Sequence, residues 1–179
     1  MTAAAQARFE ALYTDTFARL LGFALRRCDC AEDAADVVAE TFAIAWRRLD
    51  AVPPGAEAVL WLYGVARNVL ANHRREVARR HDLARALAGE ITDWYVRSAE
   101  ETAADVAVGQ AFRALPDDDR ELLSLVAWEG LDHGEIASVL GCSRNAVRIR
   151  LHRARKRLAR ELSAAGMAGM RPAISGGVW

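Results

Sequence analysis

The stretch from Arg144 to Arg160 contains eight basic side chains and no Asp or Glu. They are Arg144, Arg148, Arg150, Arg153, Arg155, Lys156, Arg157 and Arg160. So many like charges repel one another unless an anion lies opposite them. A guanidinium group donates two parallel hydrogen bonds, which suits both a phosphate and the acceptor edge of guanine. The stretch is therefore predicted to bind a polyanion, and DNA is the simplest one.

A solvated C-terminal helix is the alternative interpretation of these cations, because they favour the negative end of a helix dipole. The surrounding residues favour DNA binding. Asp132 and Glu135 are spaced as a capping box, Gly141 suits a sharp corner, and Ser143 is a good N-cap for a second helix. An apolar stripe then recurs at helical spacing in Val147, Leu151, Ala154 and Leu158. Leu131 to Leu158 is predicted to be a helix-turn-helix motif with an exposed basic face.

A second basic stretch, Arg67 to Arg85, follows two aromatic residues, Trp61 and Tyr63, in a helix predicted from about Glu57 into the eighties. Rings that receive unstacked bases, beside arginines that follow the backbone, are typical of sites for single-stranded nucleic acid. The competing interpretation makes Trp61 and Tyr63 core residues and the arginines a solvated flank. The residues alone leave both interpretations open.

The composition is that of a helical protein. The 179 residues suffice for one domain of ordinary size or two small ones. Ala, Leu and Arg dominate, and no stretch alternates between polar and apolar residues as a hairpin strand does. No apolar run approaches the length that spans a bilayer. The N-terminus shows no signal-peptide pattern, so a cytoplasmic location is expected.

The residues that could support catalysis or metal binding are few. Three cysteines, Cys28, Cys30 and Cys142, suit a reducing compartment better than a disulfide framework. The first two are too few for a zinc site, and His73 and His81 are not at a recognisable zinc spacing. The sequence shows no clustered carboxylates, no nucleophile–base pattern and no phosphate-binding loop. We expect no enzymatic activity, cofactor or metal.

Helical periodicity and its breaks predict an all-α fold of two small domains joined by a linker. The first domain is expected at residues 6–84, with Pro53 and Pro54 separating its second and third helices. A linker follows at 85–104. The second domain, which contains the helix-turn-helix, is expected at 105–163, and a flexible tail at 164–179.

Three stretches, in this order, resemble bacterial RNA polymerase sigma factors of the extracytoplasmic-function (ECF) group. DAADVVAETFAIAWRRLD (Asp33 to Asp50) resembles the family's polymerase-binding helix. WLYGVARNVLANHRRE (Trp61 to Glu76) resembles its promoter-melting and minus-ten segment, and Ala114 to Leu158 its C-terminal domain. The resemblance covers about Phe9 to Leu162. It implies a protein that binds core RNA polymerase, directs promoter-specific initiation and helps to melt the DNA.

The resemblance also implies partners and three sets of site residues. The partners are core RNA polymerase, promoter DNA and an anti-sigma factor. The polymerase-binding surface comprises or rests on Asp33, Asp36, Val37, Glu40 and Trp46. The minus-ten residues are Trp61, Arg67, Asn68, Asn72 and Arg75, with Asn68 near the pocket for a flipped base. The minus-thirty-five residues are Arg144, Asn145, Arg148, Ile149, His152 and Arg153.

Two positions depart from the family pattern. The loop at Asp50 to Glu57, in the place of the family's specificity loop, carries Pro53 and Pro54 instead of polar and aromatic residues. Ile149 replaces a small or polar residue and could contact a thymine methyl group. Both bear on which promoter is recognised.

Two other functions fit part of the pattern. A helix-turn-helix regulator whose N-terminal domain senses a ligand or dimerises explains the C-terminal half equally well, but it leaves the second aromatic and basic helix without a role. A helical adaptor without DNA contact would require that reversing the charges of Arg148 and Arg153 leaves transcription unchanged.

Overall fold

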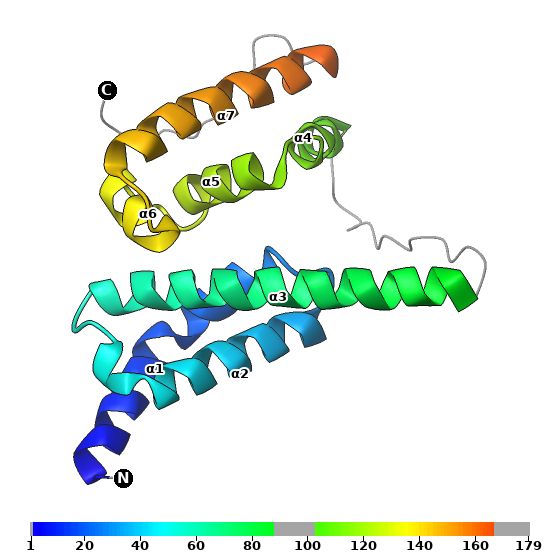
Figure 1. Cartoon of the computed structure of the whole chain (residues 1–179). Helices are drawn as coiled ribbons and strands as arrows, with labels where there is room; N and C mark the ends of the chain where they lie inside the picture. Colours follow the sequence, from blue (N-terminus) through cyan, green and yellow to red (C-terminus); the bar gives the residue numbers. More distant parts are fainter. Residues whose placement is uncertain (1, 88–102, 167–179) are drawn as a thin grey trace. The chain divides into compact units, whose positions relative to one another are not determined.

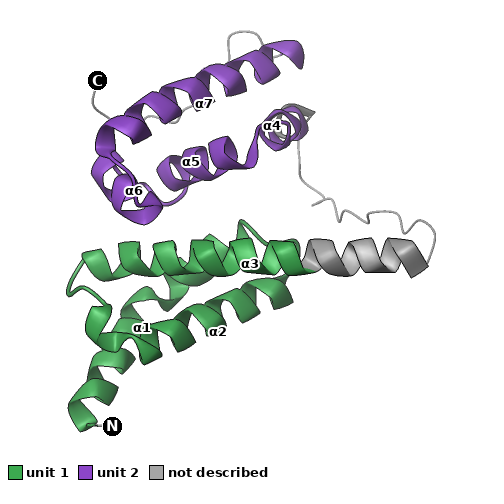
Figure 2. Cartoon of the chain, in the orientation of Figure 1, with its two compact units in different colours: residues 1–91 green, residues 92–179 purple. Residues whose placement is uncertain are grey.

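The computed structural model describes residues 2–87 and 103–166, with side chains at 2–76 and 106–166. These residues form seven α-helices and one short 3-10 helix, and no strand occurs among them. The chain divides into two compact units, Met1–Ile91 and Thr92–Trp179 (Figure 2). The prediction of an all-α fold is confirmed.

The first unit is a three-helix assembly. Its helices are α1 (Ala3–Leu25), α2 (Ala31–Arg47) and α3 (Glu57–Leu87), with the 3-10 helix η1 (Leu49–Ala51) after α2 (Figure 1). Each of the three α-helices packs against the other two. The break predicted at Pro53 and Pro54 lies between η1 and α3, where Arg8 Nη2 of α1 donates a hydrogen bond to the Val52 carbonyl at 2.7 Å.

The core of the first unit shows which of the two aromatic residues of α3, Trp61 or Tyr63, is buried. Tyr63 is only 1% exposed, and its ring stacks on that of Phe23 at a centroid distance of 4.7 Å. Tyr63 is therefore a core residue and is not available to bases. Trp61, two residues earlier on the helix, is half-buried, so the two aromatic residues have different environments.

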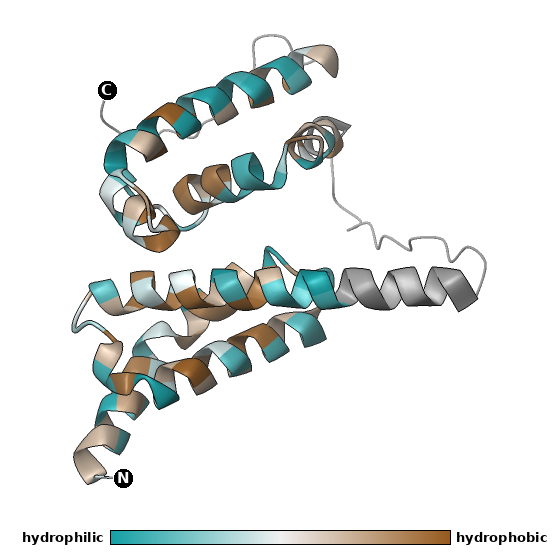
Figure 3. Ribbon diagram, in the orientation of Figure 1, coloured by the Kyte–Doolittle hydropathy of each residue, from teal (hydrophilic) through white to brown (hydrophobic). Residues whose placement is uncertain are grey.

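The second unit contains α4 (Ala103–Arg113), α5 (Asp117–Ala127), α6 (His133–Leu140) and α7 (Arg144–Ala164). α7 packs against each of the other three. In Figure 3, α7 is coloured as largely hydrophilic with a few apolar positions. A helix of this composition depends on those apolar positions for its attachment to the core.

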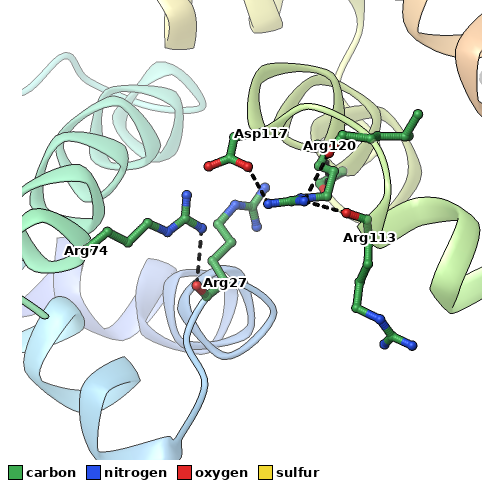
Figure 4. Close-up of polar contacts among 7 residues, drawn as sticks. Arg27, Arg74, Arg113, Asp117 and Arg120 are labelled. Atoms are coloured by element: carbon green, nitrogen blue, oxygen red, sulfur yellow. Dashed lines mark hydrogen bonds and ion pairs between the residues drawn. The ribbon is translucent and has the colours of Figure 1, made fainter. Parts of the chain in front are cut away.

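The turn between α4 and α5 is held by one arginine. Arg120 Nη1 donates to the carbonyls of Arg113 at 2.8 Å and Leu115 at 3.0 Å, and Nη2 pairs with the Asp117 carboxylate (Figure 4). Pro116 occupies the N-cap of α5, one residue before its first turn.

Several predictions concern residues outside the described parts. These residues are most of the predicted linker at 85–104 and most of the predicted tail at 164–179. Within the described residues, no helix combines the length and apolar character needed to cross a membrane.

Candidate nucleic-acid and polymerase interfaces

The start of α6 is a complete capping box. Asp132 Oδ1 accepts hydrogen bonds from the Gly134 N–H at 2.5 Å and the Glu135 N–H at 2.9 Å. Glu135 Oε2 in turn accepts one from the Asp132 N–H at 2.8 Å. The hydrogen bonds from the Glu135 and Gly134 backbones stabilise the carboxylate and hold the pKa of Asp132 below its usual 3.8. The predicted capping box is thus confirmed.

The corner between α6 and α7 also has the predicted residues. Gly141 adopts a left-handed conformation, with φ of 62°, which glycine tolerates without steric cost. Ser143 Oγ then accepts a hydrogen bond from the Ala146 N–H at 3.2 Å and caps α7. The four residues of the predicted apolar stripe, Val147, Leu151, Ala154 and Leu158, are all buried, and Leu162 extends the stripe by one turn. These contacts fix which face of α7 points outward.

The outward face of α7 carries all six residues expected to read the minus-thirty-five element. Arg144, Asn145, Arg148, Ile149, His152 and Arg153 are exposed. Arg148 Nη2 donates a hydrogen bond to Asn145 Oδ1 at 3.0 Å, so these two side chains form one polar group. No ion pair involves Arg144, Arg148 or Arg153 among the described residues. These three cations are therefore available to a polyanion.

A shallow pocket of about 320 Å³ lies at the start of this face. Its lining residues are His133 of α6 and Arg144, Asn145 and Arg148 of α7. The sequence interpretation did not include His133. It is the first residue of α6, and its proximity to α7 depends on the corner at Gly141, so the sequence spacing alone carried no signal for it.

Two other arginines of α7, both partly exposed, pair with the acidic first turn of α5. Arg150 Nη2 lies 3.6 Å from Asp118 Oδ2, and Arg157 Nη1 pairs with Asp119 Oδ2. The basic stretch identified in the sequence is therefore not uniform. Part of it is neutralised by the acidic first turn of α5, and the part between Arg144 and Arg153 on the outer face is not.

On α3, four of the five minus-ten residues share one face. Trp61, Asn68, Asn72 and Arg75 follow one another at spacings of seven, four and three, which place them on one stripe of a continuous helix. The last three are exposed and Trp61 is half-buried. Arg75 Nη2 donates to Asn72 Oδ1 at 2.5 Å. Arg67 is half-buried and lies off this stripe by its helical position.

Other polar residues of α3 connect it to its neighbours. His73 Nε2 lies 3.2 Å from Asp33 Oδ1 at the start of α2. Arg74 Nη2 donates to the Arg27 carbonyl, just after the end of α1, at 3.3 Å (Figure 4). The basic stretch of α3 thus also contains residues that hold the first unit together.

The residues expected to form a polymerase-binding surface on α2 have different environments. Asp36 and Glu40 are exposed, one turn apart. Val37 is 1% exposed and can only support such a surface from beneath. Trp46 is half-buried, with its ring 4.8 Å from that of Phe9 of α1. Asp33 is half-buried against His73, as described above.

The residues expected to bind the polymerase did not include one acidic residue of α2, Glu32. Glu32 is exposed and lies one turn before Asp36, so Glu32, Asp36 and Glu40 form an acidic stripe at successive spacings of four residues. The spacing was visible in the sequence and could have identified Glu32.

The cysteines near the start of α2 are free thiols. Cys30 caps the helix, its Sγ accepting a hydrogen bond from the Asp33 N–H at 3.4 Å. Burial, reinforced by the nearby Asp33 carboxylate, raises the pKa of the Cys28 thiol to about 11. Over the described residues, no three His, Cys, Asp or Glu side chains gather as metal ligands would.

The fold and these surfaces define a class of protein, a helical DNA-binding protein with a helix-turn-helix in its second unit. Two family models match the chain. Sigma-70 region 2 matches residues 12–80 in the first unit, and Sigma-70 region 4 matches residues 105–158 in the second.

Curated relatives agree with both matches. The sigma-H factor of Pseudomonas aeruginosa is 30% identical over 155 residues, covering 80% of this chain and 80% of that protein. The ECF sigma factor SigC of Mycobacterium tuberculosis is 33% identical over 128 residues, covering 70% of this chain and 68% of its own length. RfaY of Xanthomonas campestris is 35% identical over 133 residues, and this chain spans only 33% of its length.

Two solved structures share the fold. CnrH, in complex with the cytosolic domain of CnrY, has a TM-score of 0.61 and 29% identity, with 89% of this chain and 90% of that chain covered. The sigma factor RpoE of Bartonella quintana, in complex with the anti-sigma factor NepR, has a TM-score of 0.65 and 23% identity, with 87% and 96% covered.

The chain belongs to the ECF group of RNA polymerase sigma factors. It acts in transcription initiation with core RNA polymerase and promoter DNA as partners. The alternative of a ligand-sensing helix-turn-helix regulator is not favoured, because the first unit matches sigma region 2.

Proposed function

We propose that α7 selects the promoter by reading the minus-thirty-five element in duplex DNA. The observation that carries this proposal is the outer face of α7, where Arg144, Arg148 and Arg153 are exposed and form no ion pair among the described residues. Asn145, Ile149 and His152 complete the face. An α-helix fits the major groove, where arginine recognises guanine and an apolar side chain recognises the thymine methyl group.

The stripe on α3 is proposed to bind the minus-ten strand as the DNA opens. Asn68 and Asn72 offer amide groups that can hydrogen-bond to base edges, and Arg75 offers a charge for the backbone. Trp61, at the start of the stripe, offers part of an aromatic ring for stacking. Arg67 would act beside the stripe. Removing a base from the stack costs energy, and a pocket that fits one base offsets this cost for that base only. Such a site therefore selects a sequence and, by the same contact, keeps the two strands apart.

The acidic stripe of α2 is proposed to bind core RNA polymerase. Glu32, Asp36 and Glu40 present three carboxylates over two turns, which favours a basic partner surface. Val37 is buried beneath this surface, and the Trp46 ring packs against Phe9 of α1. Asp33, near the start of α2, is proposed to contribute through its pairing with His73 of α3.

These assignments divide the chain as follows. Residues 6–84 form a domain for polymerase binding and minus-ten recognition, 85–104 a linker, 105–163 a domain for minus-thirty-five recognition, and 164–179 a tail. We propose that the protein makes and breaks no bond itself and acts in the cytoplasm with the polymerase. Because RpoE of Bartonella quintana forms a complex with an anti-sigma factor, we also propose an anti-sigma factor as a partner here.

The test is reconstitution. Purified protein and core RNA polymerase are mixed with a library of promoter fragments, and the transcripts are sequenced. The proposal expects initiation downstream of a shared pair of elements, only when both proteins are present. Specific binding to duplex DNA by the protein alone, with no stimulation of the polymerase, would contradict it. Neutralising the acidic stripe with Asp36→Asn and Glu40→Gln should weaken assembly with the polymerase, whereas Arg148→Ala should leave assembly intact.

A further inference from the structure

We infer that Asp119 is a positioning residue that sets the orientation of the DNA-reading face of α7. Asp119 is the third residue of α5, and it is 7% exposed. Its Oδ2 accepts a hydrogen bond from Arg157 Nη1, which lies 38 residues later on α7. The inference rests on the proposed reading of the minus-thirty-five element by α7. Asp119 would influence this reading without itself contacting DNA.

The acidic turn at the start of α5 contains three consecutive aspartates with different partners. Asp117 pairs with Arg120 of its own helix, and its side chain is 72% exposed. Asp118 lies 3.6 Å from Arg150 of α7 and is 74% exposed. Asp119 alone is nearly enclosed, with 11% of its side chain exposed. All three charges lie in the first turn, where the helix dipole favours them, so the dipole alone does not explain why the third one is directed into the contact with α7.

The two pairs to α7 are well placed to fix its orientation. Arg150 and Arg157 are seven residues apart, which is two helical turns, so they lie on one flank of α7 about 10 Å apart along its axis. Rotating α7 by about 20° would move a side-chain end some 6 Å from the axis by about 2 Å. A shift of that size breaks a hydrogen bond to a base edge.

The chemistry of the pair also suggests a positional role. A buried carboxylate is costly to desolvate, and an apolar residue often stabilises such a contact equally well. The pair differs from an apolar contact in demanding one geometry, since the carboxylate must meet the guanidinium group. The apolar stripe of α7 fixes which face of the helix points inward, and the ion pair adds a directional contact that a small rotation of α7 about its axis would break.

The experiment uses the holoenzyme made with core RNA polymerase and the full chain. It measures the ratio of transcription from a promoter with the preferred minus-thirty-five element to transcription from one with a single base pair changed in that element. Three variants are compared: Asp119→Asn, Arg157→Gln, and Asp117→Asn as the matched control. The control removes the same charge from the same turn of α5 without touching α7. It therefore corrects for any general change in attraction to DNA.

We expect Asp119→Asn and Arg157→Gln to reduce the ratio at least about fivefold, which lies within the range of effects that a single mismatched base pair has on binding. Asp117→Asn should stay within about twofold of the wild type. The exchange Asp119→Arg with Arg157→Asp should recover at least part of the ratio. A purely structural role lowers the amount of active protein but leaves the ratio unchanged, because the molecules that remain folded read DNA normally.

If Asp119→Asn fails to fold, as judged by circular dichroism, Arg157→Lys takes its place, because it keeps the charge and removes the planar fork. An unchanged ratio in every folded variant of this pair overturns the inference. A reduction of the same size in Asp117→Asn overturns it as well. If the wild-type protein itself shows no dependence on the minus-thirty-five sequence, the proposed role of α7 has failed, which is a different result.

Discussion

Replacing Arg148 with alanine should weaken promoter choice and leave both folding and polymerase binding intact. Arg148 is exposed on the outer face of α7, where its guanidinium group donates to Asn145. A surface substitution of this kind changes the free energy of unfolding by about 0.5 kcal/mol or less. A bidentate contact to a base is worth about 1–3 kcal/mol of discrimination. The expected loss of promoter discrimination is therefore about 5-fold to 150-fold.

Arg160 provides a matched control on the same helix. It is also an exposed arginine of α7, but it lies 12 residues further along, which is about 18 Å. That distance exceeds the width of the major groove, about 12 Å. Arg160→Ala removes the same charge and should change promoter discrimination less than about twofold. A difference between the two variants therefore reflects position on the helix and not net charge.

The assay is transcription by the reconstituted holoenzyme from competing promoters, at several salt concentrations. If Arg148 contacts a base, Arg148→Ala changes discrimination, and the salt dependence of binding changes little. If it contacts a phosphate, Arg148→Ala weakens binding to all promoters alike, and the negative slope of log affinity against log salt becomes less steep by about 0.9. Unchanged transcription by Arg148→Ala, or loss of its assembly with the polymerase, would refute the assignment.

Three further predictions concern the described residues. Asp132→Ala should destabilise the second unit by about 0.5–2 kcal/mol, measured by thermal unfolding. Because folding lowers the pKa of Asp132, its charge stabilises the fold at pH values above its usual pKa of 3.8. This contribution should be lost as the pH falls through the lower pKa of the folded state. Tyr63→Ala should cost about 3–5 kcal/mol of stability because it empties a core position, whereas Trp61→Ala should cost less and reduce opening of the promoter, as read by permanganate footprinting; the reverse pattern would contradict both assignments. The raised pKa of Cys28 means that folding stability should fall as the pH rises from the usual 9.0 towards about 11, and Cys28→Ser should flatten that part of the pH profile in denaturant titrations.

The helix-turn-helix was the part of the fold most fully predictable from sequence. Its capping box, its glycine corner and its apolar stripe are local signals, and each involves residues within a few positions of one another. The distinction between Trp61 and Tyr63 was not predictable in the same way. Both are aromatic residues in one helix, and only the packing of Tyr63 on Phe23, 40 positions earlier in the sequence, shows which one belongs to the core.

The sequence alone could not show, for the same reason, which cations of α7 pair with α5 and which remain unpaired. Arg150 and Arg157 look like Arg148 and Arg153 when the residues are read in order. Their partners, Asp118 and Asp119, are more than 30 positions away in the sequence. The sequence pattern identified which face of α7 is apolar, but it did not show which cations flank that face and are neutralised.

This division bears on how tightly the second unit needs to bind DNA. With two arginines of α7 paired to α5, fewer charges remain for phosphates, so the sequence-independent part of the affinity is smaller than the count of basic residues suggests. Low affinity is acceptable in a sigma factor, because binding to the polymerase supplies a high effective concentration of α7 near the promoter. Reducing the number of free cations then favours specificity, since base contacts make up a larger share of the remaining interaction. The acidic turn of α5 would thus act on promoter choice in two ways, by holding α7 in one orientation and by limiting its attraction to DNA of any sequence.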